Sequence, residues 1–167
     1  MIVPSLSIVA FQYLEQKDKV LKLNQALQYC GEVGKPMLNV GCGDNPRVIG
    51  DVNIDVHPAG VSIIPRYIEA SIYDLPFMDK EAGAACAFSV IEHVERPQEA
   101  LAELSRVADR VYVTVPYPLD LSTYFHFDHK WAFIGSKAVR INPAGNWLTV
   151  GSIGLGAGMI YASGRRA

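Results

Sequence analysis

The sequence has little charge, and this shortage narrows the class of protein. Only 19% of its 167 residues are charged, 50% are hydrophobic, and the formal net charge is -2. Such a composition is typical of a globular chain rather than a disordered one. A net charge close to zero gives no electrostatic support for binding a nucleic-acid backbone. We therefore expect a single domain with its own core, whose partners do not include nucleic acid.

Cysteine is also scarce. Cys30, Cys42 and Cys86 stand far apart and form no C-x-x-C pair. Their odd number, and the burial we expect for the last two, favour reduced thiols and hence a cytoplasmic protein. Residues 1–11 are apolar but lack the basic region that opens a secretory signal, so we interpret them as part of the fold.

Long hydrophobic runs are missing as well. Residues 142–164 carry no charge, but glycines and polar residues interrupt them. A membrane span needs about 20 predominantly apolar residues, so none is predicted. The segments Trp147–Ile153 and Met159–Ser163 flank a glycine-rich turn, which predicts an antiparallel hairpin at the edge of a sheet. A homodimer could form through this hairpin.

The rest of the chain alternates between helical and extended patterns, which predicts an α/β fold with a largely parallel sheet. Residues 13–30 have helical spacing, and we expect their apolar side chains to face the sheet: Leu14, Val20, Leu21, Ala26 and Leu27. A second helix is predicted at Pro97–Ala108. The predicted strands are Met37–Val40, Asp51–Asp55, Ala84–Val90 and Arg110–Val115, with a further apolar region at Tyr67–Ile72.

The link between the first two strands is unusually short. Few residues separate Gly43 from Val52, and Pro46 stands among them. A crossover between parallel strands usually takes about a dozen residues or more. The first crossover helix is therefore expected to be reduced to a turn or missing.

The stretch from Met37 to Asp55 carries the clearest functional pattern. A short strand ends in Gly41-Cys42-Gly43, and the next strand ends in Asp55. Open α/β folds hold nucleosides in this way, with glycines where the backbone approaches the ligand and an acid that accepts bonds from the ribose hydroxyls. A nicotinamide-binding G-x-G-x-x-G would need glycine where Pro46 stands, so a dinucleotide fits less well.

Five segments in this order resemble the class I, Rossmann-like methyltransferases that use S-adenosylmethionine. They read LNVGCGDNPR, VNIDV, DLPF, SVIEHVERP and VYVTVPYP, and the first is similar to a branch whose motif is LN-x-GCG. The resemblance implies a three-layer, mostly parallel sheet and one domain over 1–167. Its parts would be an N-terminal helical segment (1–35), a cofactor-binding core (36–118), and an acceptor loop with the C-terminal hairpin (119–167).

The implied activity is methyl transfer from S-adenosylmethionine to a small molecule, a glycan or lipid precursor, or a protein. The alternative is a degenerate member of the same fold that binds the cofactor or a partner without turnover.

The resemblance also implies which residues hold the methionine end of the cofactor. Gly41, Cys42 and Gly43 would pass beneath it, with backbone groups near its amino and carboxylate ends. Ser89 and Val90, at the end of the fourth strand, would border it through their backbone.

At the adenosine end, Asp55 would hold the ribose hydroxyls and Val56 would lie against the adenine. Ser71 and Ile72 match the pair that contacts the adenine edge, although serine stands where relatives usually have aspartate. Asn39 stands where many relatives have an acid.

Three histidines are the candidate catalytic residues. His93 follows the fourth strand, and it acts as a base, orients the acceptor, or begins the next helix and makes only local bonds. His126 and His129 follow the fifth strand, where they could contact the acceptor, pack in an aromatic loop or, with Asp128, bind a metal. We assign no metal site from the sequence.

Overall fold

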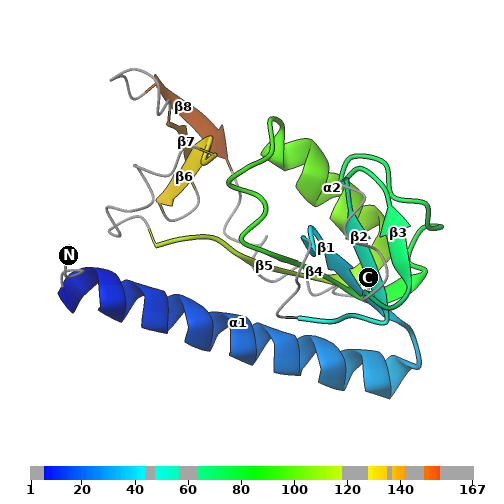
Figure 1. Cartoon of the computed structure of the whole chain (residues 1–167). Coiled ribbons are helices and arrows are strands. Elements are labelled where there is room, and N and C mark those ends of the chain that lie inside the picture. The colour runs from blue at the N-terminus through cyan, green and yellow to red at the C-terminus, as the bar shows by residue number, and fades with distance from the viewer. Residues whose placement is uncertain are drawn as a thin grey trace.

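A parallel five-stranded sheet forms the centre of the protein. The computed structural model describes residues 6–43, 48–56, 64–117, 128–134, 137–141 and 149–154. Across the sheet the strands are β3 (Tyr67–Glu69), β2 (Val52–Asp55), β1 (Met37–Val40), β4 (Ala82–Phe88) and β5 (Ala108–Thr114), and every neighbouring pair is parallel. The helices α1 (Leu6–Val33) and α2 (Pro97–Val107) lie on opposite sides of the sheet (Figure 1). The predicted three-layer α/β architecture is confirmed.

The main core lies between the sheet and α2. The helix begins with Pro97 in its first turn, and its buried side chains recur at helical spacing: Ala100, Leu101, Leu104 and Val107. They pack on apolar residues of β1 and β4 such as Leu38 and Ala85. The predicted helix and its inward face are confirmed, because burial of such an apolar stripe is the main source of helix stability in proteins.

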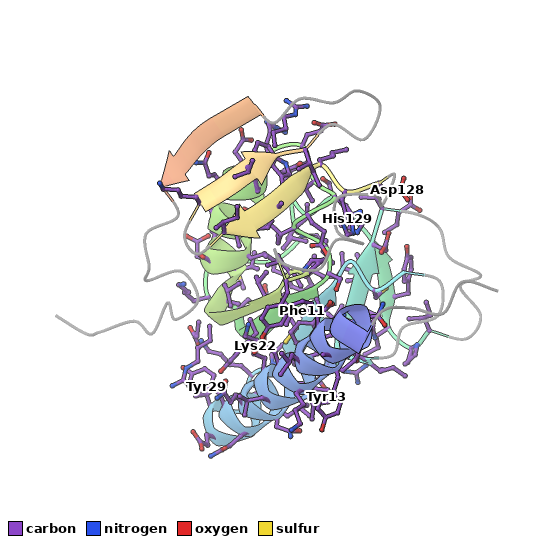
Figure 2. The ribbon with its side chains drawn as sticks, turned by 90° about the vertical axis from the view of Figure 1, so that its left-hand side faces the viewer. Phe11, Tyr13, Lys22, Tyr29, Asp128 and His129 are labelled. Carbon is purple, nitrogen blue, oxygen red and sulfur yellow. The ribbon has the colours of Figure 1, made fainter. Side chains whose placement is uncertain are left out.

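The predicted inward face of α1 is wrong in all but one position. Ala26 is buried, but the other four apolar side chains point outward and are between 44% and 57% exposed: Leu14, Val20, Leu21 and Leu27. Lys22 and Tyr29 lie on one side of the helix in Figure 2, and Tyr13 lies on the other.

The side of α1 that faces the sheet combines apolar packing with hydrogen bonds, and its Ala26 and Cys30 pack with strand residues such as Met37. Lys22 Nζ donates to the carbonyl of Val113 at 2.7 Å, on the edge strand β5. Ser89 Oγ donates to Glu15 Oε1 at 2.9 Å. Unpaired backbone carbonyls on an edge strand favour such contacts over an apolar helix face. Hydrophobic periodicity alone therefore identifies the helix but not which of its faces packs against the sheet.

The first crossover carries no helix in its described part, residues 41–43 and 48–51. The segment around Val48 and Gly50 is instead held by two buried asparagines. Asn39 Nδ2 donates to Val48 O at 2.7 Å and to Asn53 Oδ1 at 3.1 Å. Asn53 Oδ1 also accepts from Gly50 N at 2.9 Å, and Asn53 Nδ2 donates to Gly50 O at 3.2 Å. The shortened crossover is confirmed, and these amides replace the packing that a helix would supply.

A separate antiparallel sheet follows the core. Its order is β6 (Trp131–Ile134), β7 (Lys137–Arg140) and β8 (Thr149–Gly154). The antiparallel C-terminal pairing is confirmed, but the described partner of β8 is β7, in a sheet distinct from the five-stranded one. The predicted arm Met159–Ser163 lies outside the described residues. Within the described part of the chain, neither helix is long and apolar enough to cross a membrane.

Candidate functional site

A cavity opens at the carboxyl ends of β1, β2 and β4, beside the point where the strand order reverses. Ligands of open parallel sheets bind in the crevice at this point. Its volume is about 540 Å³, within the range of about 300–1,000 Å³ found for small-molecule sites. Seven of the ten candidate cofactor residues line it: Gly41, Asp55, Val56, Ser71, Ile72, Ser89 and Val90.

The glycine turn and the acid of β2 meet at one end of this cavity. Gly43 N donates to Asp55 Oδ2 at 2.8 Å. The turn is also tied to β2 because Gly41 N and Cys42 N donate to Ile54 O at 2.8 and 3.1 Å. A carboxylate beside a backbone turn at a strand end is the arrangement that the sequence predicted.

Gly41 can have no side chain in this turn. Its φ is +74°, a value that L-residues with a Cβ rarely adopt. A Cβ there would also overlap the methyl groups of Val90 and lie 3.2 Å from Val90 Cβ. The missing side chain therefore allows the segment after β4 to close against the turn after β1.

The segment after β4 is itself strained. Ser89 has φ +55°, and its N–H donates to Thr114 O at 2.9 Å. Non-glycine residues in this region cost on the order of 1–3 kcal/mol and occur preferentially at functional sites. The bonds of Ser89 to β5 and to Glu15 on α1 hold this conformation beside the cavity.

Three of the ten candidate residues do not line the cavity. Asn39 is buried and supports the β1–β2 link. Cys42 is buried and packs with Ile64 and Tyr67. Gly43 is exposed and contributes its N–H to Asp55.

Ser71 lines the cavity and closes a tight turn. Its Oγ accepts from Tyr73 N at 3.3 Å, and its carbonyl accepts from Asp74 N at 3.0 Å. Asp74 is exposed and does not line the cavity, so it does not replace the acid that Ser71 lacks.

His93 also lines the cavity, together with Lys130 from the segment before β6. Its Nδ1 lies 3.0 Å from the carbonyl of Asp128, and its ring meets that of His129 edge-on at a centroid distance of 4.8 Å. His129 is buried and does not line the cavity. His126 lies outside the described residues. Figure 2 labels Asp128 and His129 side by side.

Glu92 is the residue of this region whose environment is most unusual. Its side chain is fully buried, and neither carboxylate oxygen has a hydrogen-bond partner within the described structure. Burial raises the pKa of Glu92 to about 8, because a charged carboxylate loses its hydration there. One carboxylate oxygen of Glu92 and one ring nitrogen each of His93 and His129 lie within 4.8 Å of one another.

Comparison with known families agrees with this geometry. Residues 39–110 match the model of a family described as a methyltransferase domain. The matched span covers every cavity-lining residue except Lys130. It supports methyl transfer by a class I enzyme, and the family implies S-adenosylmethionine as methyl donor. No curated protein matches the chain.

Sequence reasoning missed Asn53 and the burial of Glu92. Asn53 stands two residues before Asp55 on β2, so both side chains point to the same face of the sheet, and this spacing is the signal that could have found Asn53. Glu92 precedes His93 directly after an apolar strand, but its full burial depends on the later segment 128–131. That contact joins residues far apart in the chain and has no local signal.

Proposed function

We propose that the protein is an S-adenosylmethionine-dependent methyltransferase of the branch with an LN-x-GCG motif. The observation that carries the proposal is the 2.8 Å bond between Gly43 N and Asp55 Oδ2 at the rim of a cavity at the strand-order reversal. It brings a carboxylate that can accept two hydroxyls next to a turn in which Gly41 has no room for a side chain.

The residues present fit an adenosyl ligand in the cavity. Asp55 would accept hydrogen bonds from the ribose hydroxyls, and the exposed apolar side chain of Val56 would cover one face of the adenine. Ser71 would contact the adenine edge without a charge. Gly41 and Val90 would lie beside the methionine part.

The bound donor supplies a sulfonium methyl group, which a nucleophile of the acceptor attacks in line. The protein's main contribution is to hold acceptor and donor together, and positioning of this kind supplies about 7–11 kcal/mol. His93 and Lys130 also line the cavity, and an acceptor would lie near them. If the acceptor is a hydroxyl, His93 is the described residue placed to take its proton.

Calorimetric titration of S-adenosylmethionine into Asp55→Asn and Glu69→Gln tests donor binding. Glu69 pairs with Asp55 in the β2–β3 register, is exposed and does not line the cavity. The control variant Glu69→Gln therefore removes one negative charge, as Asp55→Asn does, but outside the site. Asp55→Asn keeps an acceptor for Gly43 N but removes a charged acceptor for hydroxyls, which contributes about 1.5–3 kcal/mol per bond. We expect a loss of about 10- to 150-fold in affinity for Asp55→Asn and wild-type affinity for Glu69→Gln. Equal affinities in all three proteins contradict the proposal.

The second candidate is a subunit of the same fold that binds the donor without turnover. Serine at position 71, in place of an acid, is the observation that favours it. Incubation with methyl-labelled donor and a panel of hydroxyl, amine and protein acceptors distinguishes the two. Labelled product supports the enzyme, whereas tight donor binding without product supports the subunit.

A further inference from the structure

We propose that Glu92, His93 and His129 form a binding site for a divalent transition-metal cation, for which Zn²⁺ is the probe. The buried carboxylate without a partner is the first observation. A buried polar group with no hydrogen bond costs several kcal/mol and calls for an explanation, such as an ion. Both carboxylate oxygens of Glu92 are in this state within the described residues, and the side chain is 0% exposed.

The donor set is the second observation. One carboxylate oxygen and two imidazole nitrogens lie within 4.8 Å of one another. Ligands of a tetrahedral zinc at about 2.0–2.2 Å lie roughly 3.3–3.6 Å apart, so side-chain rotations that shorten these distances by on the order of 1 Å complete the site. Two histidines and a glutamate are a set that binds zinc and leaves one coordination position open.

The tautomer of His93 is the third observation. A carbonyl oxygen accepts but does not donate, so the contact of His93 Nδ1 with Asp128 O at 3.0 Å requires a hydrogen on Nδ1. Nε2 of a neutral ring then carries the lone pair. Metal-binding histidines usually donate their other N–H to a carbonyl or carboxylate in this way.

The backbone holds the two halves of the site together. Lys130 N and Trp131 N both donate to the carbonyl of Glu92, at 2.8 and 3.2 Å. Trp131 Nε1 donates to the carbonyl of Val94 at 2.8 Å. The segment that carries His129 is therefore fixed against the turn that carries Glu92 and His93, and it does not need to fold around the cation.

This site is independent of donor binding, because Glu92 and His129 do not line the cavity. A metal on His93 excludes its use as a proton acceptor, since the same lone pair would be occupied. The cation would instead stand beside the acceptor end, where its open position can take an oxygen or nitrogen ligand. A chain that binds Zn²⁺ but not S-adenosylmethionine would support the metal site and contradict the methyltransferase.

The test is calorimetric titration of Zn²⁺ into chelator-treated protein at neutral pH. We compare wild type, Glu92→Gln and His129→Gln with Glu95→Gln, because Glu95 is exposed and bonds Lys130 and Arg140 outside the cluster. Changing a residue that only supports a metal ligand costs about 10- to 100-fold in affinity, so losing a ligand is expected to cost more than about 100-fold. Glu95→Gln is expected to bind as wild type does, with one Zn²⁺ per chain. Mg²⁺ is expected to bind weakly, because imidazole does not suit it.

A second readout covers the case of a variant that folds poorly. Co²⁺ bound by wild type is expected to give the absorption of a tetrahedral site, and Zn²⁺ is expected to raise the Tm of wild type and of Glu95→Gln only. Calorimetric titration of S-adenosylmethionine into Glu92→Gln is expected to give wild-type affinity, because Glu92 does not line the cavity. No Zn²⁺ binding by wild type, or unchanged binding in Glu92→Gln, overturns the proposal.

Discussion

Replacing Gly41 by alanine tests how the glycine turn shapes the cavity. The new Cβ would stand at φ +74° and overlap the methyl groups of Val90. Gly34 and Gly43 provide matched controls, because both have positive φ, +66° and +64°, with no atom within 4 Å of an added Cβ. Gly34 ends α1 far from the cavity, and Gly43 lies beside it.

The magnitude follows from two contributions. A left-handed conformation costs an alanine roughly 1–2 kcal/mol, and this cost is shared by all three variants. Overpacking adds about 1–3 kcal/mol at Gly41 only, because the β-branched side chain of Val90 is stiff. Gly41→Ala is therefore expected to lose about 2–5 kcal/mol of unfolding free energy, against about 1–2 for Gly34→Ala and Gly43→Ala.

Thermal unfolding and donor binding measure the two consequences. For a chain of this size about 2–4 °C of Tm corresponds to 1 kcal/mol, so Gly41→Ala is expected to lower Tm by about 4–20 °C and each control by about 2–8 °C. Because Val90 lines the cavity, Gly41→Ala is also expected to weaken S-adenosylmethionine binding about tenfold or more, or ~1.4 kcal/mol. Gly34→Ala should keep wild-type affinity. A Gly41→Ala protein as stable as Gly34→Ala, with wild-type affinity, would refute the reasoning.

Two further variants test the support around the site. Asn53→Leu leaves the backbone groups of Gly50 without their buried partners, so we expect a loss of about 3 kcal/mol of unfolding free energy, or about 6–12 °C in Tm. The control Asn24→Leu, at an exposed position, should change the Tm little. Equal Tm values in the two variants would show that Asn53 does not stabilise this segment. Arg106 lowers the pKa of Glu103 by hydrogen bonding, so the stability this pair contributes is present above the unfolded pKa of about 4.3 and is lost as pH falls through the lower folded value. Denaturant titrations should therefore show Glu103→Gln about 1–2 kcal/mol less stable than wild type at pH 7, and this difference should shrink in acid. A difference that does not change with pH would contradict the stabilising role of the Glu103–Arg106 pair.

The elements that sequence reasoning found are those with local signals. The apolar stripe of α2, the small residues of β4 and the glycine turn before β2 all have short-range patterns, and each element formed within two residues of its expected bounds. The approach of Asp55 to the turn also followed, because parallel neighbouring strands bring their carboxyl ends to one edge.

The orientation of α1 could not be predicted because it depends on what the sheet presents to it. Lys22 bonds the carbonyl of Val113 on the edge strand, and Ala26 and Cys30 pack on the sheet. This orientation leaves other apolar side chains of the helix, such as Leu21, exposed. The cluster of Glu92, His93 and His129 could not be predicted for a related reason: the sequence groups His129 with the neighbouring Asp128, whereas the fold places it beside Glu92. Both features depend on contacts between residues distant in the chain.

Hydrogen–deuterium exchange with and without S-adenosylhomocysteine tests the central claim most directly. If the cavity binds the adenosyl group, amide protection should rise at residues 41–43, 55–56, 71–72 and 89–90, while residues 100–107 of α2, none of which lines the cavity, exchange as before. Unchanged exchange in the four segments around the cavity, at a saturating ligand concentration, would contradict the account.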